Sequence, residues 1–166
     1  MKNPRDILTI HPLSLGRGGV GSKQKEGDGI TPIGDYKILS VLYRPDKLAR
    51  PDTSLPTLPI AKNAIWVDDP ASPDYNQQLC TDHYPYHHEK LWRNDDIYDL
   101  LAVLDYNHNP IIKGKGSAIF IHLARPNLTP TEGCIAIARH DFYQLIKIAN
   151  QHSLCHIDKD SIYLTR

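Results

Sequence analysis

The clearest hydrophobic pattern in the chain lies between residues 117 and 137. An apolar run at residues 118–121 ends in His122, and a loop with two prolines follows. The sequence Thr131-Glu132-Gly133-Cys134 then leads into a second apolar run at residues 135–138. This order predicts a strand, a loop and a second strand, with a histidine leaving the first strand and a cysteine entering the second.

Alternating or β-branched segments predict further strands elsewhere. The segment at residues 97–107 is compatible with a helix or a strand. A strand ending in a turn is favoured, because Asn-His-Asn-Pro closes the segment and another strand follows. The remaining strands are expected at residues 6–11, 36–43, 64–67 and 161–165.

Only one segment has a clear helical period, at residues 141–151. Phe142, Leu145 and Ile146 recur there at helical spacing. Asp141 falls in the first turn, where a negative charge suits the helix dipole. Many short strands, much turn and one helix predict a mainly β fold, with residues 1–166 forming a single domain.

Three connecting segments have unusual compositions. A glycine-rich stretch at residues 15–28 is expected to be a wide hairpin turn, or else a loop whose lysines, Lys23 and Lys25, line a cleft. The segment at residues 44–62 contains four prolines and is expected to be a long irregular insertion, a kind of loop that often forms a lid. Residues 80–93 crowd histidines, tyrosines, an acid and a tryptophan into a loop-like stretch.

Composition and charge exclude several classes of protein. Of the 166 residues 40% are hydrophobic, which indicates a globular chain, and 19 basic residues balance 19 acidic ones. This balance argues against nucleic acid or an anionic membrane as a partner. No apolar run approaches the roughly 18 residues of a membrane span. The first twelve residues lack the apolar centre of a signal peptide. A cytoplasmic protein is therefore expected, or a periplasmic one if a leader had been trimmed.

The cysteines and histidines suggest neither disulfides nor a metal. The three cysteines, Cys80, Cys134 and Cys155, are odd in number and irregular in spacing, which argues against a disulfide framework. The nine histidines show no spacing typical of a metal site. No metal and no other cofactor is expected.

Cys134 and His122 form the candidate catalytic pair. A histidine beside a cysteine can shuttle the thiol proton, and as imidazolium it lowers the thiol pKa. Gly133 allows tight backbone geometry, so the N–H groups of Gly133 and Cys134 are candidate donors to an oxyanion. On the residues alone, a buried free cysteine and a strand-end histidine remain the simpler interpretation.

These residues resemble the catalytic box of the L,D-transpeptidase catalytic domain family (YkuD-like). That family has a histidine, a variable loop and then Ser/Thr-His-Gly-Cys, which His122, Thr131, Gly133 and Cys134 match. Glu132 stands in place of the second histidine. Further matches and one departure lie elsewhere in the segment from residue 6 to residue 150: Thr31-Pro32-Ile33-Gly34, Asp141, and Ala136 in place of the family's usual arginine.

The resemblance implies a β-sandwich or open barrel with a helix after the catalytic cysteine. It also implies that the carbonyl of Leu123 holds the histidine. The implied partner is a peptidoglycan stem peptide or muropeptide, with a thioacyl-enzyme formed as D-alanine leaves. An amine acceptor gives L,D-transpeptidation, and water gives L,D-carboxypeptidase action on recycled muropeptides. A non-catalytic binder of peptidoglycan fragments, and a cysteine amidase or protease acting on other peptides, remain alternatives.

Several residues are candidates for substrate binding. Because Ala136 replaces the usual arginine, either Arg125 or Arg139 is expected to grip a substrate carboxylate, or each is a surface arginine. Strand alternation favours Arg125. The other candidates, each weighed against a purely structural role, are Thr131 and Glu132 in the box, His88 in a polar pair with Glu89, and Trp66 along a substrate groove.

Overall fold

The computed structural model describes residues 7–166, and it is mainly β with one helix. The predicted strands are present, although residue 6 of the first one lies outside the described part. The strands are β1 (Ile7–Ile10), β2 (Val20–Gly21), β3 (Thr31–Pro32), β4 (Gly34–Tyr43), β5 (Thr57–Pro59), β6 (Ala64–Val67), β7 (Gln78–Cys80), β8 (His88–Lys90), β9 (Leu100–Leu104), β10 (Phe120–Leu123), β11 (Ile135–Ile137), β12 (Leu154–Ile157) and β13 (Ile162–Thr165). The helix is α1 (Arg139–Ile148).

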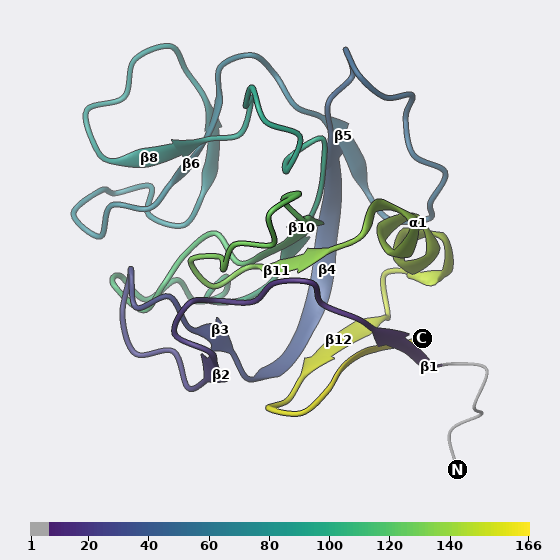
Figure 1. Cartoon of the computed structure of the whole chain (residues 1–166). Helices are drawn as coiled ribbons and strands as arrows, with labels where there is room; N and C mark the ends of the chain where they lie inside the picture. The colour runs from purple at the N-terminus through teal and green to yellow at the C-terminus, as the bar shows by residue number, and fades with distance from the viewer. Residues whose placement is uncertain (1–6) are drawn as a thin grey trace.

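The main sheet is organised around the ten-residue strand β4 (Figure 1). Its strand order is β1-β13-β12-β4-β9-β10-β11, and β5 pairs with β4 outside this path. The first part of β4 pairs with β12 and the second part with β9, with an irregularity between Ile38 and Ser40. A bulge of this kind bends a strand, and the sheet curls accordingly. The predicted mainly β fold is therefore confirmed.

Helix α1 covers one face of this curled sheet. It begins two residues before the predicted start and buries Phe142, Leu145 and Ile146. These side chains pack in one core with Ile121 of β10 and Ile135, which opens β11. The apolar side of the helix and the apolar face of the sheet thus bury each other. Packing of this kind is the main source of stability for a short helix in a protein.

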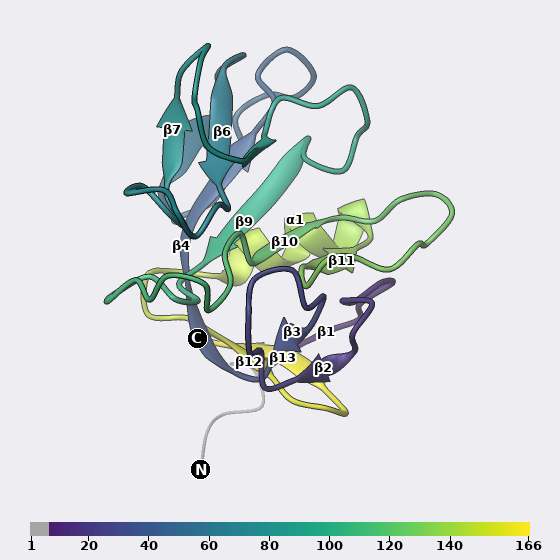
Figure 2. The same ribbon diagram turned by 90° about the vertical axis from the view of Figure 1, so that its left-hand side faces the viewer.

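A second, smaller sheet lies beyond the other face of β9 and β10 (Figure 2). Its strand order is β7-β6-β8, antiparallel throughout. Trp66 of β6 is buried between the sheets. Its ring and that of Phe120 pack edge to face with centroids 4.9 Å apart, and its Nε1 donates to Asn76 Oδ1 at 2.9 Å. Trp66 is therefore a core anchor, and the expectation that it lines a substrate groove is wrong.

The glycine-rich segment is not a hairpin turn. Its strand β2 pairs in parallel with β3, which follows the segment, whereas β1 pairs with β13 at the other end of the chain. Glycines signal tight backbone, but they do not specify which strands pair. At Gly16 a side chain would place Cβ 2.1 Å from the carbonyl oxygen of Gly29, so glycine allows a close approach of two loop strands.

The proline-rich segment at residues 44–62 is not a lid. Its strand β5 extends the main sheet in parallel with β4. Thr53 Oγ1 donates to the carbonyl of Ile146 at 2.5 Å, and Ser54 Oγ donates to that of Ala149 at 3.0 Å. The segment thus satisfies carbonyl groups at the end of α1 that the helix leaves without partners.

The described residues were also searched for a membrane-spanning helix and for a group of metal ligands. No helix within residues 7–166 has the length and apolar character needed to cross a membrane. Over the same residues, no group of three or more histidine, cysteine or acidic side chains is arranged to hold a metal ion.

Candidate active site

Parallel pairing of β10 with β11 brings the predicted histidine and cysteine to one place. The register sets His122 beside Ala136, so Cys134, two residues earlier, lies diagonally across from His122. Phe120 N–H approaches Cys134 Sγ at 3.4 Å. Because side chains alternate along a strand, these residues face the second sheet while Ile121 faces the helix side.

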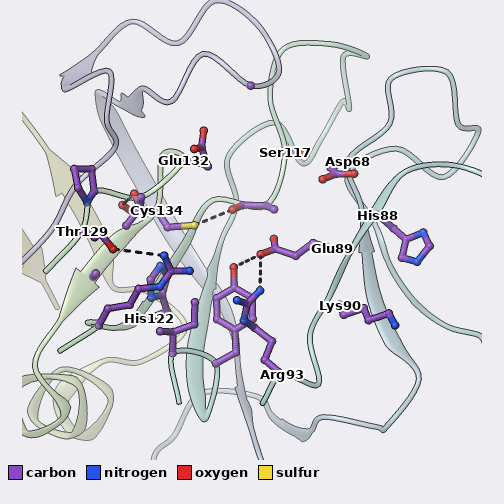
Figure 3. A pocket seen from close by; sticks show the side chains of 18 of the residues that line it. Asp68, His88, Glu89, Lys90, Arg93, Ser117, His122, Thr129, Glu132 and Cys134 are labelled. Carbon is purple, nitrogen blue, oxygen red and sulfur yellow. Dashed lines mark hydrogen bonds and ion pairs between the residues drawn. The ribbon is translucent and has the colours of Figure 1, made fainter. Parts of the chain in front are cut away.

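Both side chains open into a cavity of about 640 Å³ (Figure 3). Its walls come from β8 and the segment after it, from residues 125–132, and from the glycine-rich segment. The nucleophile candidate is 8% exposed and the histidine 5%, so both are shielded from bulk water although they border the cavity.

The box before Cys134 is a tight turn that needs glycine at one position. Gly133 has φ +133°, and an added Cβ would lie 2.9 Å from the carbonyl oxygen of Ile30. Thr131 braces the turn: its Oγ1 donates to the carbonyl of Cys134 at 2.6 Å and accepts the Gly133 N–H at 3.2 Å. The Cys134 N–H has no hydrogen-bond partner among the described residues.

The orientation of His122 fixes which nitrogen is free. Its Nδ1 lies 2.9 Å from the carbonyl oxygen of Leu123, the group indicated by the family resemblance. A carbonyl only accepts, so Nδ1 carries the proton and Nε2 keeps its lone pair. The edge of the Tyr98 ring packs against the imidazole with centroids 5.4 Å apart.

Burial keeps both groups neutral in this structure. It raises the pKa of the Cys134 thiol to about 12, with the negative charge of Glu89 as a smaller cause. It also lowers the pKa of His122 to about 4, although the bond to Leu123 acts in the opposite direction. The expectation that imidazolium depresses the thiol pKa is therefore wrong here. The thiol instead donates to the carbonyl of Ala118 at 3.1 Å.

The pH dependence of the reaction should reveal this neutral pair. His122 accepts a proton only when neutral, so kcat/KM should fall as the pH drops through about 4. It should show no alkaline limb from Cys134 up to pH 9, because the thiol pKa lies well above that value. Initial rates between pH 3.5 and 9 would test this. A bell-shaped profile with thiolate absorbance at pH 7 would contradict it.

Folding stability should depend on pH through the same histidine. Its pKa is lower in the folded than in the unfolded state, so below pH 6.5 the unfolded chain binds the extra proton first. The free energy of unfolding should therefore decrease as the pH falls from about 6.5 to about 4, which denaturant unfolding measured at several pH values would show.

The two arginine candidates lie in different places. Arg125 lines the cavity, where Nη1 is 3.5 Å from Thr129 Oγ1, and it has no carboxylate partner among residues 7–166. Arg139 instead lies 3.4 Å from Asp99 and is outside the cavity lining. Of these two arginines, Arg125 lines the cavity and Arg139 does not.

The remaining candidates border the cavity with partners of their own. Glu132 accepts bonds from Arg17 Nε at 2.9 and 3.0 Å, and this exposed pair joins the glycine-rich segment to the Cys box. His88 Nδ1 lies 2.8 Å from the carbonyl of Tyr86. Lys23, an alternative cleft residue, is instead buried in an ion pair with Asp28 at 2.6 Å.

Sequence reasoning missed much of the far wall of the cavity. Tyr98 and Arg93 line it, and Glu89, considered only as part of a polar pair, points toward Cys134. Glu26 lines another side, where it accepts hydrogen bonds from the hydroxyls of Tyr75 and Ser117. No local pattern distinguished these residues, because they come from segments that meet only in the folded chain.

Comparison with known proteins agrees with this geometry. The family model described as L,D-transpeptidase catalytic domain (YkuD) matches residues 2–157 of the 166-residue chain. Searches of curated proteins and of solved structures found no match. A match over nearly the whole chain, together with a buried cysteine and histidine in one cavity, shows that the chain belongs to the L,D-transpeptidase catalytic domain family.

Proposed function

We propose that this protein transfers acyl groups from peptidoglycan stem peptides through a thioacyl-enzyme at Cys134, acting as an L,D-transpeptidase. The family acts on peptidoglycan peptides. One observation carries the proposal for this chain: a shielded thiol and an imidazole with its Nδ1 occupied border the same cavity. Such a histidine presents an unprotonated Nε2 to accept the thiol proton.

The first half of the reaction forms the thioester. Nε2 of His122 takes the thiol proton as Cys134 Sγ attacks the carbonyl carbon of the residue before D-alanine, which the family resemblance gives as meso-diaminopimelate, a diamino acid. The Cys134 N–H is the candidate donor to the oxyanion, because the Gly133 N–H is already bonded to Thr131. Collapse of the tetrahedral intermediate breaks the C–N bond, and His122 returns its proton to the departing amine of D-alanine.

The second half regenerates the thiol. An acceptor amine attacks the thioester carbon and gives its proton to His122, which returns it to the sulfur as the C–S bond breaks. Water in place of the amine gives L,D-carboxypeptidase action instead. That outcome would suit a cytoplasmic protein that trims recycled muropeptides, which is the second candidate function from the sequence.

Arg125 is the proposed contact for the carboxylate of the departing D-residue. Replacement by alanine should lower kcat/KM by roughly 10-fold to 100-fold, the loss of one charge-assisted contact worth about 1.5–3 kcal/mol. The melting temperature should barely change, because Arg125 makes no ion pair with a described residue. Steady-state kinetics on one tetrapeptide would measure the effect. Arg139→Ala is the matched control, and an unaffected Arg125→Ala enzyme would reject the assignment.

Intact-protein mass spectrometry tests the reaction itself. The protein mixed with a tetrapeptide muropeptide should gain the mass of the substrate less D-alanine, on Cys134 only. An added amine acceptor should discharge the adduct to a cross-linked or exchanged product. Discharge by water alone, even with the amine present, would establish the carboxypeptidase instead. Binding of the muropeptide without any adduct would establish a non-catalytic binder.

A further inference from the structure

We propose that Glu89 determines donor specificity by binding an ammonium group on the side chain of the acyl-donor residue. The inference rests on the proposed function, because it assigns a role within the same cavity. It goes further by naming the residue that distinguishes a cationic donor from a neutral one.

Strand β8 directs Glu89 into the cavity. In Figure 3 the carboxylate of Glu89 points toward the Cys134 side, whereas His88 and Lys90 point the other way. Alternation along the strand explains this difference between neighbours. Among the side chains of β8, the one that faces the nucleophile is therefore an acid.

Neighbouring groups hold this carboxylate in one position. The Tyr98 hydroxyl donates to Glu89 Oε1 at 2.6 Å, and the same ring packs edge-on against the imidazole of His122. The carboxylate is thus positioned relative to the catalytic base through a single buried side chain. A group bound to Glu89 would have a defined place relative to the reacting sulfur.

The nearest cation to Glu89 among the described residues is Arg93, and most of its hydrogen bonding goes elsewhere. Arg93 donates from Nε and Nη2 to Asp95 at 2.8 and 2.7 Å, and its Nη1 approaches Glu89 only to 3.9 Å. One guanidinium therefore serves two carboxylates. The negative charge of Glu89 reaches the nucleophile, since it contributes to the raised thiol pKa of Cys134. Burial raises the pKa of the Glu89 carboxyl, because its charged form has little solvent and no close counter-ion. An ammonium group bound beside it would stabilise the carboxylate.

The two sides of the cavity differ in charge in a way that fits the two residues joined by the scissile bond. Thr129, whose hydroxyl contacts Arg125, and Glu89 lie on opposite sides of the Cys134 sulfur (Figure 3). If the carboxylate of the leaving residue binds Arg125, the side chain of the donor residue extends toward Glu89. A diamino acid brings an ammonium group to that position, and a carboxylate binds it through a charge-assisted hydrogen bond.

Two matched donor peptides test the assignment. They differ in one group: a free side-chain amine on the donor residue, or the same amine acetylated. The rate of thioester formation on Cys134 is followed by intact mass. Wild-type protein should prefer the cationic donor by about 10-fold to 100-fold, the range for one contact to a charged group. Glu89→Gln, which keeps the size of the side chain, should reduce this ratio to near one.

A matched control separates charge at Glu89 from charge elsewhere in the cavity. Glu132→Gln removes a carboxylate on a different wall, bonded to Arg17, and should leave the ratio of the two rates at its wild-type value. The melting temperature and the alkylation of Cys134 by iodoacetamide would check that each variant is folded with an accessible thiol.

Three results would overturn the inference. A Glu89→Gln variant with the wild-type ratio would show that the carboxylate does not distinguish the donors. An equal loss with both donors would show that Glu89 only positions Tyr98 and His122. No thioester with either donor in wild-type protein would remove the proposed function and this inference together, whereas the first two results leave the proposed function standing.

Discussion

Replacement of Cys134 by alanine should abolish turnover, to below about 10⁻³ of the wild-type rate, because no other described group in the cavity can form the thioester. Cys134 is the one cysteine that borders the cavity among residues 7–166. The measurement is the release of D-alanine from a tetrapeptide, together with the mass of the protein. The alanine variant should bind the peptide without gaining mass.

The other two cysteines provide the controls. Cys80 is exposed and Cys155 is buried in the main core, away from the cavity. Cys80→Ala should behave as wild type. Cys155→Ala should keep most of the activity, although it shortens a buried side chain and should cost about 1 kcal/mol of stability. Full activity in the Cys134→Ala variant would reject the mechanism.

Replacement of His122 by alanine should lower kcat about 10²-fold or more, the usual effect of losing general acid–base catalysis. The thiol would keep its high pKa without a base to take its proton. The remaining activity should also lose the fall near pH 4 that His122 causes in the wild-type protein. Rates measured across pH with one tetrapeptide would show both effects.

A second variant separates catalysis from folding, because His122 is a buried residue. His122→Gln retains more of the side-chain volume and should be as inactive as His122→Ala while melting closer to wild type. His88→Ala is the control, since His88 borders the cavity but is bonded through Nδ1 to the carbonyl of Tyr86. If His88→Ala were the more damaging change, the base would be misassigned.

The proximity of the candidate catalytic residues was predictable because their pattern is local. One apolar run ends in His122, the next begins after Cys134 twelve positions later, and the two strands pair directly with each other. The requirement for glycine at residue 133 was also predictable from the sequence, because it arises from the backbone conformation of the turn itself. The helix after the cysteine followed from its apolar period, within a few residues at each end.

The far wall of the cavity was not predictable from local patterns. It depends on β8 and Tyr98, which approach the site only because a second sheet packs across β9 and β10. For the same reason Trp66 was interpreted as a possible groove residue, although Asn76 and Phe120 hold it in the core. A periodicity argument shows that a side chain is buried, but not what it is buried against.

The sequence by itself therefore determined the mainly β class, the candidate nucleophile and base, and the family. These depend on residue order, strand period and the spacing of one motif. Only the tertiary structure showed the burial that keeps the pair neutral, the position of Arg125 in the cavity lining with Arg139 outside it, and the position of Glu89 facing the Cys134 side of the cavity. Burial, ion pairing and charge depend on which distant segments come together, and that is a property of the fold as a whole.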